Sequence, residues 1–328
     1  MACKKLSVLQ TARFLKKKDH FVILTHASPD GDTIGSACAL AMGLQKLGKR
    51  AYVICPEAIP KKFNYFMKKL HNRAFKYKNV IAVDVADEAL LGGLSEEFSG
   101  KIDLCIDHHI SNKEYAENLY LDADASATAE CIFSILKAMR VPLDDVMAAA
   151  LYTGISTDTG CFKYSNVTAN TFDIAKKLFA YNIGAAEINR LMFDTKSKNR
   201  LMMERMVLDT AEFHFDQRCM LLSVTTEIQN KTKCSGTELE GVAAISRSVE
   251  GVLAGVTIKQ TGEDSYKISL RTYEPLDAAN ICKRLGGGGH KAAAGCTVTG
   301  SLESVKEQIL NSVRTELEET DAGSYTDQ

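Results

Sequence analysis

Apolar residues in the first half of the chain come in short runs that alternate with longer amphipathic stretches. Four runs are mostly apolar and rich in β-branched residues, as buried parallel strands are. They are FVILT (21–25), AYVIC (51–55), VIAVDV (80–85) and KIDLCID (101–107). Helical spacing marks residues 33–50, residues 126–140 and the segment from Pro142 to about Leu151. Strands that alternate with helices predict an open parallel sheet with right-handed crossovers.

The second half of the chain has a different pattern. Its residues 183–209 are helical and rich in methionine, and we expect them to link two domains. Three runs then alternate like antiparallel strands, RCMLLSVTT, VLAGVTIKQ and SYKISLRTY. After them come a helix in DAANICKRLG, a glycine run, a short strand CTVTG and a last helix near 302–317. We predict an α/β domain at 1–182, a helical linker at 183–209, a smaller α+β domain at 210–318 and a disordered tail at 319–328.

Size and composition agree with a two-domain globular protein. A chain of 328 residues is long for one compact core and suitable for two. Its apolar fraction of 45% and charged fraction of 25% are ordinary for a soluble protein. No run approaches the roughly 18 uncharged apolar residues of a membrane span, and the lysine-bearing start lacks a signal-peptide core. We therefore expect a cytoplasmic protein with no membrane segment.

The balance of charge limits the possible partners. A net charge of −1 argues against a broad electrostatic platform for long nucleic acid. The exception is the basic run PKKFNYFMKKLHNRAFKYK (60–78), which interleaves lysines with aromatic rings. Such runs are usually amphipathic helices with a solvated lysine face, and we expect that here rather than contact with nucleic acid. Affinity for phosphate groups must then come from local sites.

Aspartates and histidines gather directly after the predicted strands. They occur in HASPDGD after the first strand, in VDVAD after the third, in IDHHISN after the fourth, and in GISTDTG further along. The residues concerned are His26, Asp30, Asp32, Asp84, Asp107, His108, His109 and Asp158. The carboxyl ends of parallel strands meet at one edge of a sheet, where ligands bind. We expect these side chains to converge in one cleft.

The chemistry of these groups predicts a metal centre. Two carboxylates in a tight Pro-Asp-Gly-Asp turn cost several kcal/mol each to bury unless a cation accompanies them. Imidazole and carboxylate ligands suit Mn²⁺, Fe²⁺, Zn²⁺ or Co²⁺, and the lack of cysteine in the clusters argues against structural zinc. The groups outnumber the needs of one ion, so we expect two. Asp87, Asp103 and Asp122 are interpreted as helix caps or turn formers instead.

The glycine-rich segment GGGGHKAAAG (286–295) is the other unusual feature. Four consecutive glycines allow backbone N–H groups to approach an anion, and His290 and Lys291 stand at the exit of the loop. A flexible linker is the alternative interpretation. The position of the run between a helix and a strand favours a binding loop.

Taken in order, HASPDGDTIGS, VDVAD, IDHHISN and GISTDTG resemble the four motifs of the DHH phosphoesterase family, and SLRTY with GGGGHKAAAG resembles its DHHA1 substrate-binding domain. The resemblance covers about residues 20–297. It is closest to the stand-alone oligoribonucleases that also dephosphorylate 3′-phosphoadenosine 5′-phosphate (pAp), and to the cyclic di-AMP and pApA phosphodiesterases. It implies a parallel-sheet DHH domain, a smaller α+β DHHA1 domain, and hydrolysis of short RNA or DNA oligonucleotides or small nucleotides.

The resemblance also implies a role for each matching residue, with two Mn²⁺ ions per chain. One ion would be held by His26, Asp30 and Asp84. The other would be held by Asp32, Asp84, His108 and Asp158, with Asp84 bridging. His109 would face the scissile phosphate, and Asp107 would orient the histidines. The far end of the substrate would be bound by Arg271, Gly287, Gly288, Gly289 and His290.

Several alternatives stay open at this point. The sequence does not choose among very short RNA, pAp, pApA and cyclic dinucleotides, and it is compatible with a homodimer. A family II inorganic pyrophosphatase shares the motifs of the first domain, but the GGGGH loop argues against it. An exonuclease for long single strands would need an added OB-like domain and a basic surface. A nucleotide sensor without turnover is disfavoured because no expected ligand is missing.

Overall fold

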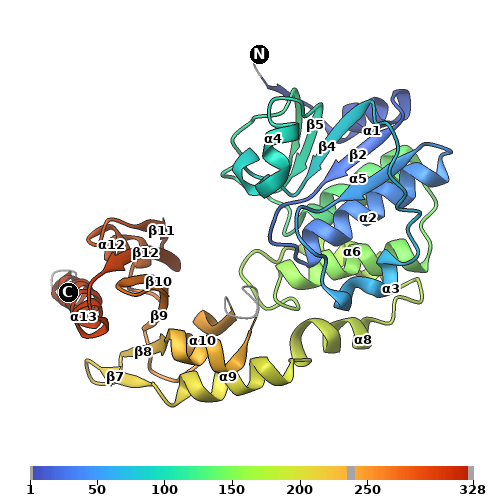
Figure 1. Cartoon of the computed structure of the whole chain (residues 1–328). Coiled ribbons are helices and arrows are strands. Elements are labelled where there is room, and N and C mark those ends of the chain that lie inside the picture. Colours follow the sequence, from blue (N-terminus) through green and yellow to red (C-terminus); the bar gives the residue numbers. More distant parts are fainter. Residues whose placement is uncertain (1–2, 235–240, 324–328) are drawn as a thin grey trace. The chain divides into compact units, whose positions relative to one another are not determined.

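The computed structural model describes residues 3–234 and 241–323. The chain separates into two compact units, Met1–Thr195 and Lys196–Gln328, which run from blue to yellow-green and from yellow to red in Figure 1. Each unit has its own sheet and its own hydrophobic core. None of the helices in these described ranges combines the length and the apolar character that crossing a bilayer requires.

The first unit is built on a sheet whose six described strands follow the order β1-β6-β5-β4-β2-β3. Their bounds are β1 Lys4–Lys5, β2 Phe21–Leu24, β3 Ala51–Ile54, β4 Asn79–Val83, β5 Leu104–Asp107 and β6 Asn118–Leu121. All pairings recorded between these strands are parallel. The parallel sheet and its four apolar strands are confirmed. Strands β1 and β6 were not predicted because the first is a pair of lysines and the second is a four-residue run without β-branched residues.

Helices cover the sheet of the first unit. They are α1 Val8–Lys17, α2 Gly31–Lys46, α3 Asn64–Met67, α4 Ser95–Phe98, α5 Thr128–Met139, α6 Asp145–Asp158, α7 Ala169–Leu178 and α8 Ala185–Asn189, with the 3-10 helices η1 Lys61–Phe63 and η2 Glu88–Leu94 and the π-helix η3 Arg190–Asp194. Helices α2, α5 and α6 pack on one another and on one face of the sheet (Figure 1). The other face is covered by residues of η2 and α4.

Two expectations for this unit were wrong. Helix α6 does not stop near Leu151, because buried residues follow one another without a break to Ser156 and the helix continues to Asp158. Asp158 therefore lies at the end of a helix and not at a strand end. The basic run 60–78 is not one amphipathic helix, since its helical part ends at Met67. The amide of Asn72 then bonds both the N–H and the C=O of Val53, which holds the chain extended along β3.

The sheet of the second unit has, in its described part, the order β11-β12-β10-β9-β8-β7. The bounds are β7 Glu212–His214, β8 Cys219–Val224, β9 Ala254–Gly262, β10 Ser265–Thr272, β11 Gly288–His290 and β12 Ala293–Thr299, with helices α9 Lys198–Leu208, α10 Thr226–Thr232, η4 Gly241–Arg247, α12 Ala278–Lys283 and α13 Leu302–Gly323. The expected antiparallel pairing holds for β9–β10, and β10 also pairs in antiparallel fashion with β12. It is wrong for β8 and β9, which are parallel because the chain crosses back through α10 and η4.

The last helix is longer than the sequence pattern predicts. Its apolar residues recur every fourth position, at Val305, Ile309, Val313 and Leu317, and all four are buried in the core of the second unit. The helix then continues to Gly323. The expectation of disorder from residue 319 is therefore wrong for its first five residues, and the remainder of that tail lies outside the described residues.

Candidate metal centre

The carboxyl ends of β2, β4 and β5 bring the predicted residues of the first unit together. His26 follows β2, Asp84 follows β4, and His108 follows β5. The possible metal ligands form three sets, and within each set the ligand atoms lie within 4.8 Å of one another. The sets are His26, Asp30 and Asp84; Asp32, His108 and Asp158; and Asp84, His108 and His109. All six residues expected to hold metal thus lie in adjoining groups, and Asp84 belongs to two of them.

The start of α2 supplies two of the aspartates. Asp30 caps this helix, and its Oδ1 accepts the N–H of Thr33 at 3.0 Å. Asp32 lies in the first turn and is 1% exposed. A Cβ on Gly31 would lie 2.3 Å from the Thr157 hydroxyl oxygen, so only glycine permits this approach of α2 to the end of α6. That contact places both aspartates beside Asp158.

Asp84 occupies the centre of the cluster. Its φ of 62° is in the left-handed region, which is strained for a non-glycine residue and common at functional sites. Its Oδ2 lies 3.6 Å from His26 Nε2. Its Oδ1 lies 3.9 Å from His108 Nε2 and 3.6 Å from His109 Nδ1. The two oxygens of one buried carboxylate therefore face different groups of candidate ligands.

Asp107 and His109 form a pair beside the cluster. His109 Nδ1 lies 2.8 Å from Asp107 Oδ1, and Asn112 donates to Asp107 Oδ2 at 2.7 Å. Burial alone would raise the pKa of Asp107, but the hydrogen bonds from His109 and Asn112 lower it. The bond to Asp107 outweighs burial and raises the pKa of His109 to about 9. Asp107 thus orients and charges this ring, while His109 keeps 43% of its side chain exposed.

Crowded carboxylates dominate the electrostatics of the centre. Burial first, and then the charges of Asp84 and Asp158, raise the pKa of Asp32 well above its usual range. The pKa of Asp158 rises to about 8 through burial and the charges of Asp84 and Asp30. Burial would lower the pKa of His26, but the hydrogen bonds that it donates to Asp30 and Asp84 raise it to about 10. Buried negative charge in excess is the environment that a bound cation relieves.

A neutral segment that the sequence analysis missed also reaches the cluster. The N–H groups of Thr128 and Ala129 donate to Asp32 at 2.6 and 2.9 Å. The Thr128 hydroxyl donates to Asp84 Oδ1 at 2.8 Å. The carbonyl of Ala125 lies 3.0 Å from His108 Nδ1. Small uncharged residues give no chemical signal, so the only clue in the sequence was the position of this segment at the start of a predicted helix.

Asp87 has the capping role that we expected, whereas Asp103 has a different structural role. Asp87 caps η2, where its Oδ1 accepts the N–H of Ala89 at 3.0 Å. Asp103 Oδ2 accepts the N–H of Val80 at 2.7 Å, which ties β5 to β4. Neither aspartate belongs to any of the three ligand groups.

In the second unit two of the predicted substrate-binding side chains share one sheet face. Arg271 on β10 and His290 on β11 are both paired with Ala293 on the strand between them, β12. Directly paired residues of antiparallel strands point to the same side. Arg271 is half-buried, and one of its guanidinium N–H groups donates to the Leu270 carbonyl at 3.0 Å. His290 is exposed.

The glycine run has a packing reason that the sequence analysis did not include. A Cβ on Gly287 would lie 2.3 Å from the Gly295 carbonyl oxygen, and one on Gly289 would lie 2.5 Å from Ala294 Cα. Both glycines are therefore needed for the chain to lie close to β12. A Cβ on Gly288 would meet nothing within 4 Å, and this glycine is exposed.

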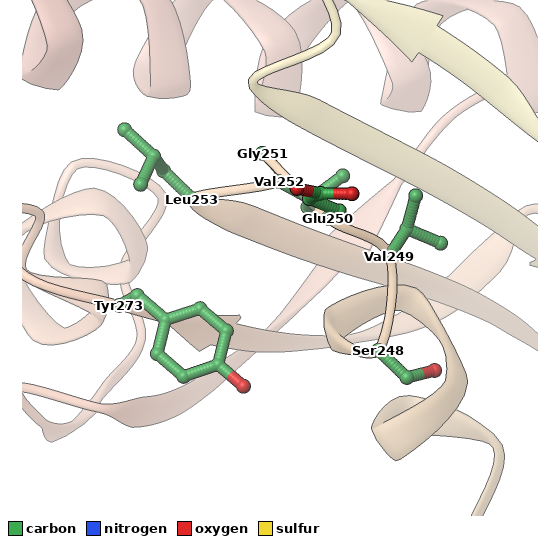
Figure 2. Close-up of a pocket in the computed structure, with 7 residues that line it drawn as sticks. All are labelled: Ser248, Val249, Glu250, Gly251, Val252, Leu253 and Tyr273. Carbon is green, nitrogen blue, oxygen red and sulfur yellow. The ribbon is translucent and has the colours of Figure 1, made fainter.

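A separate hollow of about 460 Å³ lies beside the end of β10 in the second unit (Figure 2). Its lining residues are Ser248, Val249, Glu250, Gly251, Val252, Leu253 and Tyr273. The only charged group among them is the carboxylate of Glu250, which would repel a phosphate. The hollow therefore lacks the chemistry of an anion site, and the candidate reaction centre is the aspartate and histidine cluster of the first unit.

A parallel sheet that gathers imidazoles and carboxylates at one edge, followed by a small α+β unit, is the architecture of a two-domain phosphoesterase. The chain belongs to the DHH family. Its residues 20–155 match the family model described as "DHH family, N-terminal domain", and residues 220–319 match the DHHA1 domain. This result confirms the resemblance stated for the motifs and the fold class expected from it.

Known proteins support this membership along most of the chain. A "Bifunctional oligoribonuclease and PAP phosphatase NrnA" of Thermus thermophilus is 34% identical over 90% of this chain and 89% of its own length. A "Cyclic-di-AMP phosphodiesterase PdeA" of Listeria monocytogenes is 24% identical over 91% of this chain, which spans only 48% of that relative. The crystal structure of an exopolyphosphatase-related protein from Bacteroides fragilis has a TM-score of 0.82 at 24% identity, and the match covers 94% of this chain and 96% of that one.

Proposed function

We propose that the chain hydrolyses phosphoester bonds in short oligonucleotides and in pAp, releasing nucleoside monophosphates, with two divalent metal ions. One observation carries the proposal: six side chains from separate parts of the sequence converge in two groups of possible metal ligands at one sheet edge. The Thermus thermophilus relative supports the choice of substrates, because its similarity extends through both units.

The donor set suits ions such as Mn²⁺. His26, Asp30 and Asp84 offer one imidazole and two carboxylates, and Asp32, His108 and Asp158 offer the same combination. Such nitrogen and oxygen donors are typical for Mn²⁺ and similar ions. The raised pKa values of buried Asp32 and Asp158 record repulsion that positive charge would relieve. We assign one ion to each group and a bridging role to Asp84, whose two oxygens face different groups.

A pair of such ions supplies Lewis acidity and a nucleophilic water at neutral pH. The side chains of the protein would then contact and orient the reacting phosphate. Asp107 holds Nδ1 of His109, and Nε2 of that ring has no hydrogen-bond partner in the described part of the chain. With its Nδ1 bonded to Asp107, the ring would direct Nε2 toward a phosphoryl oxygen and donate a hydrogen bond to it. The hydrogen bond to Asp107 keeps the ring in that orientation.

The second unit would bind the part of the substrate remote from the reacting phosphorus. Arg271 offers a planar guanidinium that suits bidentate phosphate contact. His290 lies on the same sheet face, and exposed Gly288 on the same strand leaves open space beside it. Binding by this unit would favour short substrates that carry a terminal phosphate.

A second candidate substrate is cyclic di-AMP, which the similarity to the Listeria monocytogenes phosphodiesterase favours. The deciding experiment compares pAp, pApA, a five-nucleotide RNA and cyclic di-AMP with one purified sample and added Mn²⁺. We expect release of monophosphate from the first three and loss of activity after chelation. Turnover of cyclic di-AMP alone would favour the second candidate. Full turnover after exhaustive chelation, or no turnover of any of the four, would refute the proposal.

A further inference from the structure

The segment Ala125–Ala129 touches both groups of candidate ligands. It bonds Asp32 and His108 of one group and Asp84, which belongs to the other. These three side chains arise from α2, from the end of β5 and from the end of β4. A single short segment therefore connects ligands that come from three parts of the sequence.

Thr128 makes two of these bonds with different atoms. Its N–H donates to Asp32 Oδ2 at 2.6 Å, and its hydroxyl donates to Asp84 Oδ1 at 2.8 Å. The two carboxylates repel each other, since the charge of Asp84 raises the pKa of Asp32. Donors from one residue at the start of α5 hold both carboxylates in place, and Thr128 itself is fully buried.

The segment is itself held rigidly. Buried Glu130 accepts hydrogen bonds from the hydroxyls of Ser126 and Thr171, at 2.5 and 2.7 Å. The side-chain amide of Asn166 donates to the Ser126 carbonyl and to the Asp158 carbonyl, at 3.0 and 3.2 Å. The segment therefore cannot follow a carboxylate that rotates, and its donors define fixed positions for the oxygens that they bind.

We propose that Thr128 is a positioning residue of the metal centre, whose hydroxyl fixes the Asp84 carboxylate so that each oxygen serves one group of ligands. The inference deepens the function proposed above and rests on it. Asp84 has Oδ2 toward His26 and Oδ1 toward His108. Rotation about its χ2 would take one oxygen out of each group, and the hydroxyl bond on Oδ1 opposes that rotation. Outer partners of this kind typically change metal affinity or activity by about 10–100-fold.

The test uses three variants of the full chain. Thr128→Val removes the hydroxyl and nearly keeps the shape, and Thr128→Ser keeps the hydroxyl and removes the methyl group. Thr11→Val is the matched control, because Thr11 is equally buried and its hydroxyl donates to the Ser7 carbonyl on α1. Calorimetric titration of Mn²⁺ into metal-free protein measures affinity, and electron paramagnetic resonance of the loaded protein distinguishes coupled from isolated ions.

We expect Thr128→Val to bind at least one ion about 10–100-fold more weakly and to lose the signal of a coupled pair. Thr128→Ser and Thr11→Val should remain close to the wild type. Unchanged affinity and coupling in Thr128→Val would overturn the inference, and so would equal impairment of Thr128→Ser or Thr11→Val. Wild-type protein that binds no Mn²⁺ and hydrolyses no substrate would instead refute the proposed function, and that result is read before any variant is made.

Discussion

The cluster of aspartates and histidines brings like charges close together, an arrangement that does not favour stability. Four aspartates lie together, and the pKa values of two of them are raised by burial and by the charges of their neighbours. Asp84 adds a left-handed backbone conformation to this repulsion. Strain and like charge that persist at one place indicate a function that requires them. Asp84 combines both, so it is the residue whose loss should be most informative.

We expect Asp84→Ala to weaken Mn²⁺ binding in both groups and to lower kcat/KM by at least about 100-fold, because a ligand and its shared charge are removed together. Calorimetric titration and a steady-state assay on pApA measure the two effects. Asp87→Asn is a suitable control, since that residue caps η2 and lies outside the three ligand groups. A variant of Asp84 that keeps two tightly bound ions and a near-normal rate would contradict its bridging role.

The charged residues of the candidate site could be predicted from the sequence, and the neutral ones could not. Packing alone seldom requires aspartates and histidines to cluster after apolar strands, so their positions predicted a metal centre. Thr128 and Ala129 act through a hydroxyl and through backbone N–H groups, which every sequence contains in large numbers. Only the fold selects the few that reach a carboxylate from another element.

Helices α2 and α6 pack closely against each other. A Cβ on Gly35 would lie 2.3 Å from the Ala150 carbonyl oxygen, and one on Gly154 would lie 2.7 Å from Asp32 Oδ1. Glycine therefore allows two helices that carry candidate ligands to approach at backbone distance. We therefore expect the geometry of the candidate metal centre to depend on this helix contact as well as on the candidate ligands.

Gly35→Ala should destabilise the first unit by roughly 1–3 kcal/mol, because its methyl group meets rigid backbone on α6. The shift between the helices should also weaken Mn²⁺ binding. Denaturant titration and calorimetry measure these two effects. Gly93→Ala is the control, since a Cβ there meets nothing within 4 Å. If Gly35→Ala is as stable as the control, then α2 and α6 can separate at little cost and the contact does not set the geometry of the centre.

Helix α9 contains a titratable contact of its own. Glu204 accepts hydrogen bonds from Lys196 at 2.8 Å and from Arg200 at 2.7 Å. Burial alone would raise the pKa of Glu204, but the bonds from these two cations lower it below the usual 4.5. The unfolded chain therefore takes up the proton first as the pH falls. The stabilising contribution of the charge is complete above pH 4.5 and is lost as the pH falls through the lower, folded pKa.

Glu204→Gln should cost on the order of 1 kcal/mol near neutral pH, and its difference from the wild type should disappear in acid. Urea denaturation at several pH values measures the difference. Glu227→Gln should change little at any pH, because that glutamate pairs with Lys231 while both side chains remain largely exposed. A constant difference between Glu204→Gln and the wild type down to pH values well below 4.5 would show that the charge of Glu204 is not the cause.

Secondary structure was predictable where one periodicity dominated. The apolar strands β2 to β5 and the helices α2 and α5 follow directly from the spacing of buried residues. The parallel pairing of β8 with β9 did not follow, since it depends on a crossover whose path no local pattern records. The end of α6 was misplaced because its polar last turn resembles a loop in sequence while its preceding residues are buried.

At the scale of the whole molecule, the two units carry different candidate functional side chains. Within the described residues, the candidate metal ligands lie in the first unit, and Arg271 and His290 lie in the second. This division was expected from the sequence, because the aspartate motifs end before residue 182 and the glycine loop follows a new set of strands. If the second unit binds the remote end of the substrate as proposed, damage to it should affect only substrates large enough to bind there.

Arg271 provides the test of this division. Burial alternates along β10, where Ile268 and Leu270 face the core and Arg271 shares the opposite face with His290 across β12. If its guanidinium binds a phosphate remote from the reacting phosphorus, Arg271→Ala removes binding energy that positions the substrate, so KM rises and kcat falls. We expect a loss of about 2–4 kcal/mol in kcat/KM on pApA, as for a charge-assisted contact.

The same variant should lose much less on bis-p-nitrophenyl phosphate, which has no group to reach the second unit. Lys267→Ala is the matched control, because this exposed cation lies on the same strand, four residues from Arg271. Both substrates are assayed with all three proteins, and thermal unfolding verifies that each variant is folded. Equal losses on the two substrates would mean that Arg271 acts on the chemical step or on folding. A loss confined to pApA and to Arg271→Ala would place substrate capture in the second unit, since neither the metal ligands nor the general charge of the strand would have changed.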